Sequence, residues 1–348
     1  MFSRIHHYNI VVLIGFIICL YYIYHLEYKL QYTLAKQSLS GYNKEKIKIA
    51  EDLYFKQQDK EVIVIYNRVP KTGSTSFVNV AYDLYKKNAF HVIHVNITGN
   101  AHVLPIDEQI RFIRNTTMWN ERKPALYHGH FGFIDFHKYG TSQPPFYINI
   151  IRKPMDRLIS YYYFLRYGDN YRPHLIRKKH GDKITFDECV NQRGTDCHPN
   201  LLWLQIPFLC GQSARCWIPG NTWALEEAKR NVVSKYMIVG VTEHLLDFIE
   251  VLEAALPNMF QNASMHFKHS SKSHLRKTVK KFKPSAHTIN IFKNSTIWQM
   301  ENDLYNFVYE HFQFIKQHTL PNTLKGSSKF RYEKIYPKSN WLLFKNLD

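Results

Sequence analysis

The residues most able to do chemistry form a short loop, Pro70-Lys71-Thr72-Gly73-Ser74-Thr75-Ser76, which follows an apolar run. Glycine lets the backbone approach a phosphate, and the first N–H groups of a following helix present a partial positive charge to it. Lys71 adds a full charge, and the three hydroxyls add donors. The G-x-x-x-x-G-K-[ST] spacing of a kinase or ATPase loop is missing. The loop therefore predicts an anion site; the alternative is an ordinary capped helix start.

A second strand–loop–helix unit repeats this pattern. Arg152 follows the apolar run Phe146–Ile151, and Ser160 lies eight residues further on. Two anion sites at one edge of a parallel sheet suit a nucleotide with phosphates at both ends. The alternative for Arg152 is a surface ion pair with Asp156.

Two histidines, His128 and His130, stand in the sequence Tyr-His-Gly-His. On an extended segment, residues two apart point to the same side. An imidazole titrates near neutrality, so it can accept the proton of a hydroxyl that attacks. Metal binding and a structural role are the alternatives.

The chain around these residues predicts one α/β domain over residues 61–348. Expected strands cover 61–67, 146–151 and 237–241, and expected helices cover 77–87, 155–167, the segment from an N-cap at Thr242 to before Pro257, and 297–315. Strands that alternate with helices indicate a mainly parallel sheet.

The formal net charge of the 348-residue chain is +18, which favours a polyanionic partner over mere solubility. Basic residues gather in two runs, Arg166–Lys183 and Lys268–Lys283. Such runs are often only solvated surface. Arginine binds carboxylate and sulfate through two hydrogen bonds, so Arg172, Arg177 and Arg276 are the preferred contacts.

The N-terminus predicts an uncleaved signal-anchor. Residues 10–26 are apolar and about long enough to span a bilayer. Residues 1–9 would form the cytoplasmic tail. Residues 27–60 would form a stem, either helical or a disordered spacer. The flanking charges do not settle the direction of insertion.

Four of the five cysteines fall in two close pairs, Cys189 with Cys197 and Cys210 with Cys216. Each pair would close a short loop in an oxidising compartment, whereas the spacings fit zinc poorly. Four N-glycosylation sequons begin at Asn96, Asn115, Asn262 and Asn294. Together these features predict a lumenal body, which argues against nucleic acid as the partner.

Several stretches resemble PAPS-dependent sulfotransferases, and more closely the heparan sulfate 2-O-sulfotransferase family (PAPS is 3′-phosphoadenosine-5′-phosphosulfate). They are YNRVPKTGSTSF (66–77), YHGH (127–130), YYYFLRYGDNYRP (161–173), TFDECV (185–190), WLQIPF (203–208), KSHLRKT (272–278) and YEKIYPKSN (332–340). One departure is Lys153, where the family commonly has an acidic residue. Arg152 itself is retained.

The resemblance implies a P-loop-like sulfotransferase fold and transfer of a sulfuryl group from PAPS to the 2-OH of hexuronic acid, chiefly iduronate, in heparan sulfate. It implies a base role for the histidine pair, of which we expect His130 to be the base and His128 to assist or orient. Lys71 would lie at the transferring group, and no metal would be needed. Donor contacts would be Lys71, Thr72, Gly73, Ser74, Thr75, Ser76, Arg152, Ser160, Ser273 and Thr278. To the acceptor contacts Arg172, Arg177 and Arg276 expected from the basic runs, the resemblance adds Arg68, Asn79, Tyr82, His94 and Lys334. The family also suggests a homotrimer and a single-pass type II protein of the Golgi membrane.

Two rival functions stay open. One is a uronyl 2-O-sulfotransferase that acts on dermatan or chondroitin sulfate. The other is a non-catalytic heparin-binding membrane protein, which would have no need of a phosphate loop and a histidine pair.

Overall fold

Five parallel strands form a single sheet in the structure, a computed structural model that describes residues 26–27 and 61–320, apart from residues 98, 100, 142 and 271–277. The strands are β1 (Ile63–Asn67), β2 (His91–Val95), β3 (Ala125–Gly129), β4 (Phe146–Ile151) and β5 (Tyr236–Val241). Their order in the sheet is β2-β3-β1-β4-β5. The mainly parallel sheet predicted from the sequence is confirmed.

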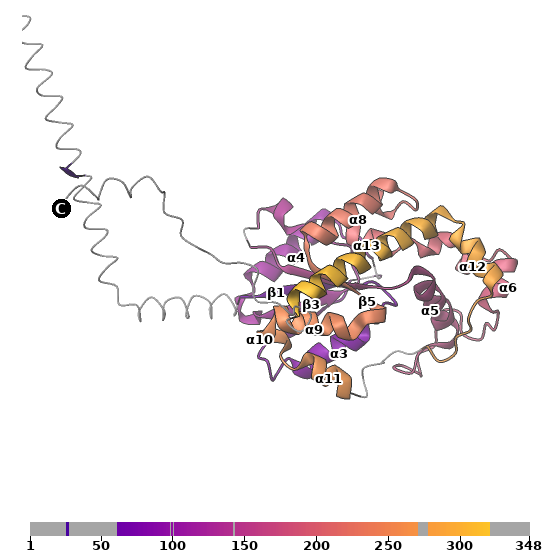
Figure 1. Cartoon of the computed structure of the whole chain (residues 1–348), viewed down its shortest axis with the longest axis horizontal. Coiled ribbons are helices and arrows are strands. Elements are labelled where there is room, and N and C mark those ends of the chain that lie inside the picture. Colours follow the sequence, from indigo (N-terminus) through magenta and orange to yellow (C-terminus); the bar gives the residue numbers. More distant parts are fainter. Residues whose placement is uncertain are drawn as a thin grey trace, which may run out of the picture. The chain divides into compact units, whose positions relative to one another are not determined.

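Helices cover this sheet, as expected where parallel strands are buried on both faces. They are α3 (Ser74–Leu84), α4 (Ile106–Met118), α5 (Pro154–Tyr167), α6 (Phe186–Asn191), α7 (Gln205–Cys210), α8 (Thr222–Ser234), α9 (Leu245–Ala255), α10 (Pro257–Phe260), α11 (Ala263–His269), α12 (Ala286–Lys293) and α13 (Thr296–Thr319). Figure 1 shows the long helix α13 crossing in front of the strands, and α8, α9 and α13 all contact β5.

The strand order reverses at β1, and this reversal places the site. From β1 the chain passes outward to β2, returns to β3 beside β1, and then crosses to β4 on the other side of β1. In an open parallel sheet, ligands bind outside the carboxyl ends of the strands at such a switch point. The segments after β1, β3 and β4 therefore meet at one edge. They contain the loop at residues 70–76 (hereafter the phosphate loop), the histidine pair and Arg152.

The elements predicted from apolar runs are present, with shifted ends. The first strand begins at Ile63 and every residue in it is buried, whereas the helix expected from Phe77 begins at Ser74. The strands β2 and β3 were not predicted as strands. Because β2 lies at the sheet edge and none of its residues is fully buried, it lacks the apolar run of a central strand.

The prediction that Thr242 caps the next helix is wrong. A short 3-10 helix, Thr242–His244, follows β5, and His244 stands at the N-cap of α9 without a side-chain capping bond. The hydroxyl of Thr242 is used elsewhere, as described below.

Among the described residues no helix is both long and apolar enough to cross a membrane. Apart from Leu26, the predicted span at residues 10–26 lies outside them.

Candidate active site

The loop between β1 and α3 contains two residues with left-handed backbone, Lys71 with φ 69° and Gly73 with φ 75°. Glycine adopts this conformation without strain. A Cβ at Gly73 would also lie 3.2 Å from Cγ2 of Thr242. The hydroxyl of Thr72 donates to the Val69 carbonyl at 3.0 Å, which closes the loop on itself. The loop therefore has a defined shape that disfavours any side chain at position 73.

Thr242 fastens this loop to the neighbouring strand. Its hydroxyl oxygen lies 2.8 Å from the carbonyl oxygen of Thr72 and 3.0 Å from that of Ile151, the last residue of β4. The sequence gives no signal for this role, because a threonine after a strand is equally typical of a helix cap.

The N-terminus of α3 lies where the sequence predicts an anion site. Its N-cap is Gly73 without a capping side chain, and its first turn contains no acidic residue. Ser74 and Ser76 are buried and Thr75 is half-buried. The Nη2 of Arg68 donates to the Ser74 hydroxyl at 3.1 Å and lies 3.4 Å from that of Thr75. The N–H groups of a helix start and the nearby cation are a combination suited to a phosphate or sulfate.

Arg152 joins this site from β4. Its Nη1 donates to the Lys71 carbonyl at 3.3 Å, so the two predicted anion units are in direct contact. Within the described part of the chain Arg152 forms no ion pair with Asp156, the alternative raised by the sequence. Ser160, the seventh residue of α5, is buried.

His128 is the last residue but one of β3 and is buried, with 3% of its surface exposed. Arg68 Nη1 lies 3.2 Å from its Nδ1, and because a guanidinium can only donate, Nδ1 must accept. Its Nε2 then carries the hydrogen and donates to the Tyr82 hydroxyl oxygen at 3.0 Å. Burial first, and the cationic Arg68 second, lower the pKa of His128 to about 2. His128 is therefore a neutral, positioned side chain.

His130 has the opposite proton arrangement. Its Nδ1 lies 2.8 Å from the Arg68 carbonyl oxygen, which only accepts, so the hydrogen is on Nδ1. In the neutral ring of His130 the lone pair is consequently on Nε2. The two histidines of the Tyr-His-Gly-His sequence thus differ in tautomer, and His130 has the form that a general base needs.

A cleft of about 290 Å³ lies beside His130 at the carboxyl edge of the sheet. Its lining residues come from the ends of β1, β2 and β3 and from the segment after α5; they are Arg68, His94, Val95, Asn96, Ile97, His130 and Arg172. His94 stacks on His128 with 4.9 Å between ring centroids and an interplanar angle of 24°. Partial burial, with Arg68 and Arg172 nearby, lowers the pKa of His94. This lowered pKa favours neutral His94, and the cleft is cationic because Arg68 and Arg172 line it, which suits an anion.

Two further predicted acceptor contacts lie on α3. The Tyr82 hydroxyl is hydrogen-bonded to Nε2 of His128, as described. The buried Nδ2 of Asn79 has no hydrogen-bond partner among the residues that the structure describes. A buried amide that lacks a partner is uncommon, so Asn79 has a donor to offer to a ligand.

The arginines of the first basic run, residues 166–183, differ in position and in partners. Arg166 is interior: it pairs with Asp182 and Asp196, and its guanidinium carbon lies 3.6 Å from the Tyr162 ring centroid. It therefore contributes to the fold. Arg172 lines the cleft.

Arg177 and Lys71 meet at one aromatic ring. The Lys71 Nζ lies 4.2 Å and the Arg177 guanidinium carbon 4.3 Å from the centroid of Phe164 on α5. Arg177 also pairs with the fully buried Asp169 at 3.6 Å. Sequence reasoning did not single out Phe164, because the run Tyr-Tyr-Tyr-Phe reads simply as core.

The remaining predicted contacts are only partly described. Thr278 forms an isolated antiparallel bridge with Asp169, which places it beside the Arg177 pair. Ser273, Arg276 and Lys334 lie outside the described residues.

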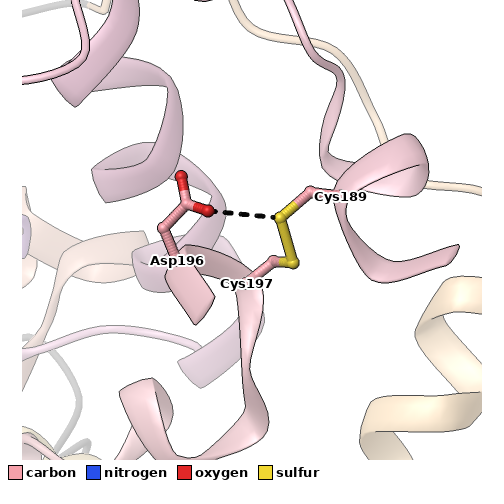
Figure 2. A group of neighbouring side chains, drawn as sticks. All are labelled: Cys189, Asp196 and Cys197. Atoms are coloured by element: carbon pink, nitrogen blue, oxygen red, sulfur yellow. Dashed lines mark hydrogen bonds between the residues drawn. A yellow bond between two sulfur atoms is a disulfide. The ribbon is translucent and has the colours of Figure 1, made fainter. Parts of the chain in front are cut away.

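Both predicted cysteine pairs are disulfides in the structure, Cys189–Cys197 and Cys210–Cys216. Figure 2 shows Asp196 beside the first of them, with one carboxylate oxygen 3.4 Å from the Cys189 sulfur. These three residues are close enough to suggest a metal site. Because the two sulfurs are bonded to each other, neither is a thiolate ligand.

The four sequon asparagines differ in accessibility. Asn96, Asn115 and Asn294 are exposed, and Asn262 is half-buried. Asn96 is also one of the residues that line the cleft.

Comparisons with known proteins agree with this geometry. Residues 54–308 match the model of a sulfotransferase family. The chain is 56% identical to the heparin sulfate O-sulfotransferase of Drosophila melanogaster, over 80% of each chain. It is 53% identical to heparan sulfate 2-O-sulfotransferase 1 of Mus musculus and of Homo sapiens, over 81% of each chain.

A mouse sulfotransferase solved with PAP also aligns. The match has a TM-score of 0.34 at 11% identity and covers 74% of this chain and 89% of that one. The sheet, the phosphate loop and the family match together define a sulfotransferase. The chain belongs to the sulfotransferase family and, within it, to the heparan sulfate 2-O-sulfotransferases.

Proposed function

We propose that this protein transfers a sulfuryl group from PAPS to the 2-OH of hexuronic acid, chiefly iduronate, in heparan sulfate. The observation that carries the proposal is the cationic cleft of Arg68, His94, His130 and Arg172, which opens next to the phosphate loop. The names of the relatives, which are 53–56% identical, supply the acceptor.

The donor would bind at the loop between β1 and α3. The N–H groups at the start of α3 and the hydroxyls of Ser74, Thr75 and Ser76 would hold the phosphosulfate. Arg152 and Ser160 would hold the 3′-phosphate, with Ser273 and Thr278 near the nucleotide. Arg152 supports this arrangement because its guanidinium already bonds to the loop.

The sulfuryl group would move in line. The uronate 2-oxygen attacks sulfur, the bond between sulfur and the bridging phosphate oxygen breaks, and adenosine 3′,5′-bisphosphate leaves with that oxygen. The proton of the 2-OH passes to Nε2 of His130, the nitrogen that has the lone pair. Lys71 and the loop amides stabilise the charge on the sulfuryl oxygens and on the departing phosphate.

His128 would assist as an orienting residue. It fixes Arg68 through Nδ1 and Tyr82 through Nε2, and its lowered pKa keeps it neutral beside these groups. The cleft residues, with Asn79, Tyr82, Arg177, Arg276 and Lys334, would contact the carboxylates and sulfates of the chain. This scheme uses no metal ion.

The remaining proposals concern the cellular setting. Residues 10–26 would anchor the protein in the Golgi membrane as a single-pass type II protein with a lumenal catalytic domain. The two disulfides and the exposed sequons are compatible with an oxidising, glycosylating lumen. A homotrimer is proposed from the family resemblance.

Sulfate transfer from PAPS to 2-O-desulfated heparin, followed by disaccharide analysis, tests the proposal. We expect new sulfate on the 2-position of iduronate. Dermatan sulfate as acceptor tests the first rival: preferential sulfation of it would move the protein to the uronyl enzymes. Retention on immobilised heparin without retention on immobilised adenosine 3′,5′-bisphosphate would support the non-catalytic rival.

A further inference from the structure

A carboxylate on α13 is buried beneath the donor side of the site. Glu301 and Gln205, the first residue of α7, are both fully buried. Burial raises the pKa of the Glu301 carboxyl, and the nearby Arg157 opposes this rise. A buried carboxylate is costly unless its oxygens are bonded, and apolar side chains would pack the same space without that cost. Its presence therefore indicates a specific role.

The two oxygens of Glu301 have separate partners. One accepts from the main-chain N–H groups of Leu204 and Ile206 at 2.9 and 3.1 Å. The other accepts from the side-chain amide Nε2 of Gln205 at 3.1 Å. Because a carboxylate only accepts, it fixes which way the Gln205 amide faces.

The oriented amide reaches the donor site. Its Oε1 accepts from the main-chain N–H of Arg152 at 2.8 Å. The side chain of Arg152 in turn donates to the Lys71 carbonyl at 3.3 Å. An unbroken chain of hydrogen bonds thus runs from Glu301 through Gln205 and Arg152 to the phosphate loop.

We propose that Gln205 and Glu301 are positioning residues for the donor site. Glu301 sets the orientation of the Gln205 amide, and this amide holds the backbone of Arg152 so that its guanidinium lies against the phosphate loop. The inference rests on the proposed function, in which Arg152 binds the donor nucleotide. Both side chains are fully buried and would act on the donor only through Arg152.

The pattern of donors and acceptors makes a reciprocal exchange possible. In Glu301→Gln, the new amide must keep its oxygen on the two main-chain N–H groups, so its nitrogen faces the nitrogen of Gln205. Two donors then oppose each other, and an amide that rotates to avoid this loses an acceptor. In Gln205→Glu, two carboxyls oppose each other and cannot both ionise. One takes up a proton, and the resulting O–H can replace part of the lost amide contact. The double variant restores every bond, with the carboxylate now at position 205.

The experiment compares the two single variants, the double variant and the wild-type full-length chain. Calorimetry gives the affinity for adenosine 3′,5′-bisphosphate, kinetics give KM for PAPS and kcat, and heparin binding reports the acceptor side. We expect Glu301→Gln to lose about tenfold in bisphosphate affinity, a typical effect of a lost buried hydrogen bond, and Gln205→Glu to lose less. The double variant should recover to within about threefold of the wild type. Heparin affinity should not change.

Asn231→Ala is the matched control. Asn231 is buried and its Nδ2 donates to Leu209 and Cys210 at the other end of α7, without a bond to Arg152. It should lower the melting temperature and leave bisphosphate affinity unchanged. This separates general loosening of α7 from the loss of the Arg152 contact.

Wild-type bisphosphate affinity in a folded Glu301→Gln variant would overturn the inference. Loss in the single variants without recovery in the double variant would overturn the orientation mechanism. If the single variants do not fold, the double variant decides: normal affinity supports the inference, and weak affinity contradicts it. A wild-type chain that does not bind the bisphosphate would instead refute the proposed function.

Discussion

The proposed donor and acceptor sides of the site differ in the chemical groups that form them. The donor side uses main-chain amides, buried hydroxyls and a loop with two left-handed residues, and Thr242 and Arg152 fasten this loop to β4. The acceptor side uses long cationic and aromatic side chains, several of them exposed, such as Arg172 and Tyr82. The donor side is therefore set by backbone geometry, and the acceptor side mainly by charge.

This difference suits the two ligands. A nucleotide has one shape, and preformed donors bind it without reorganisation. A sulfated polysaccharide varies along its length, so side chains that adapt and attract at long range are better suited to it. The two sides should consequently respond differently to mutation and to salt, and four predictions test this.

Lys71→Ala should have the largest effect. It removes a full charge next to the transferring group, where desolvation strengthens electrostatic stabilisation, so kcat should fall about a hundredfold or more. The Lys71 Nζ lies against Phe164 and is not part of the core, so the melting temperature should change little. Transfer kinetics at saturating PAPS measure this. Lys87→Ala, an exposed lysine beyond α3, is the control. Near-normal activity of Lys71→Ala would contradict the loop assignment.

The histidine pair should divide between the two roles. His130→Ala should lose about a hundredfold in kcat, the usual scale for removal of a general base, and should still bind bisphosphate and heparin. His128→Asn should lose less in kcat, because the lone pair of the His128 ring accepts from Arg68 and so does not take the substrate proton.

The pH dependence of kcat distinguishes the two histidines further. The wild type should lose activity at acid pH as the base is protonated. His128, with a pKa of about 2, is not the source of this loss, so the acid limb should persist in His128→Asn. A His130→Ala protein that transfers sulfate at the normal rate would end the general-base proposal.

Neutralising the acceptor side should have a moderate effect. Arg172→Gln should raise the glycan KM about tenfold and leave the KM for PAPS unchanged, because Arg172 lines the cleft. It should also flatten the salt dependence of heparin affinity, since fewer counterions are released. Arg111→Gln on α4, another exposed arginine, is the control. An effect confined to nucleotide affinity would place the acceptor elsewhere.

Much of the fold, and the position of the loop at residues 70–76 between a strand and a helix, could be predicted from the sequence. The central strands β1 and β4 are buried almost throughout and so appear as apolar runs, and the phosphate loop is contiguous in the chain. The edge strand β2 was missed because its half-exposed residues alternate weakly.

The contacts that organise the site could not be read from local pattern. Thr242 and Thr72 are 170 residues apart in sequence, and Glu301 and Gln205 are 96 apart. Their partners depend on the packing of the whole sheet. Likewise, the His-x-His spacing did not reveal that the two rings have different tautomers. The Nδ1 of His128 accepts from the Arg68 guanidinium, whereas the Nδ1 of His130 donates to the Arg68 carbonyl.

The smallest predicted effect is on stability, and it concerns the boundary between the two sides. His128 has a pKa of about 2 in the folded protein, against about 6.5 in an unfolded chain. Between these values the unfolded chain binds a proton that the folded protein does not. Stability from this source is therefore present above about pH 6.5 and is lost as the pH falls, by about 1 kcal/mol per pH unit.

His128→Asn removes the titrating group while keeping an oxygen that can accept from Arg68. Urea unfolding of both proteins at pH 7 and pH 5 measures the difference, in which the other histidines cancel. The wild type should lose about 1 to 2 kcal/mol more than the variant over this interval. Equal losses would mean that His128 takes up a proton in the folded state. It would then face Arg68 as a cation, and the neutral orienting role proposed for it would be wrong.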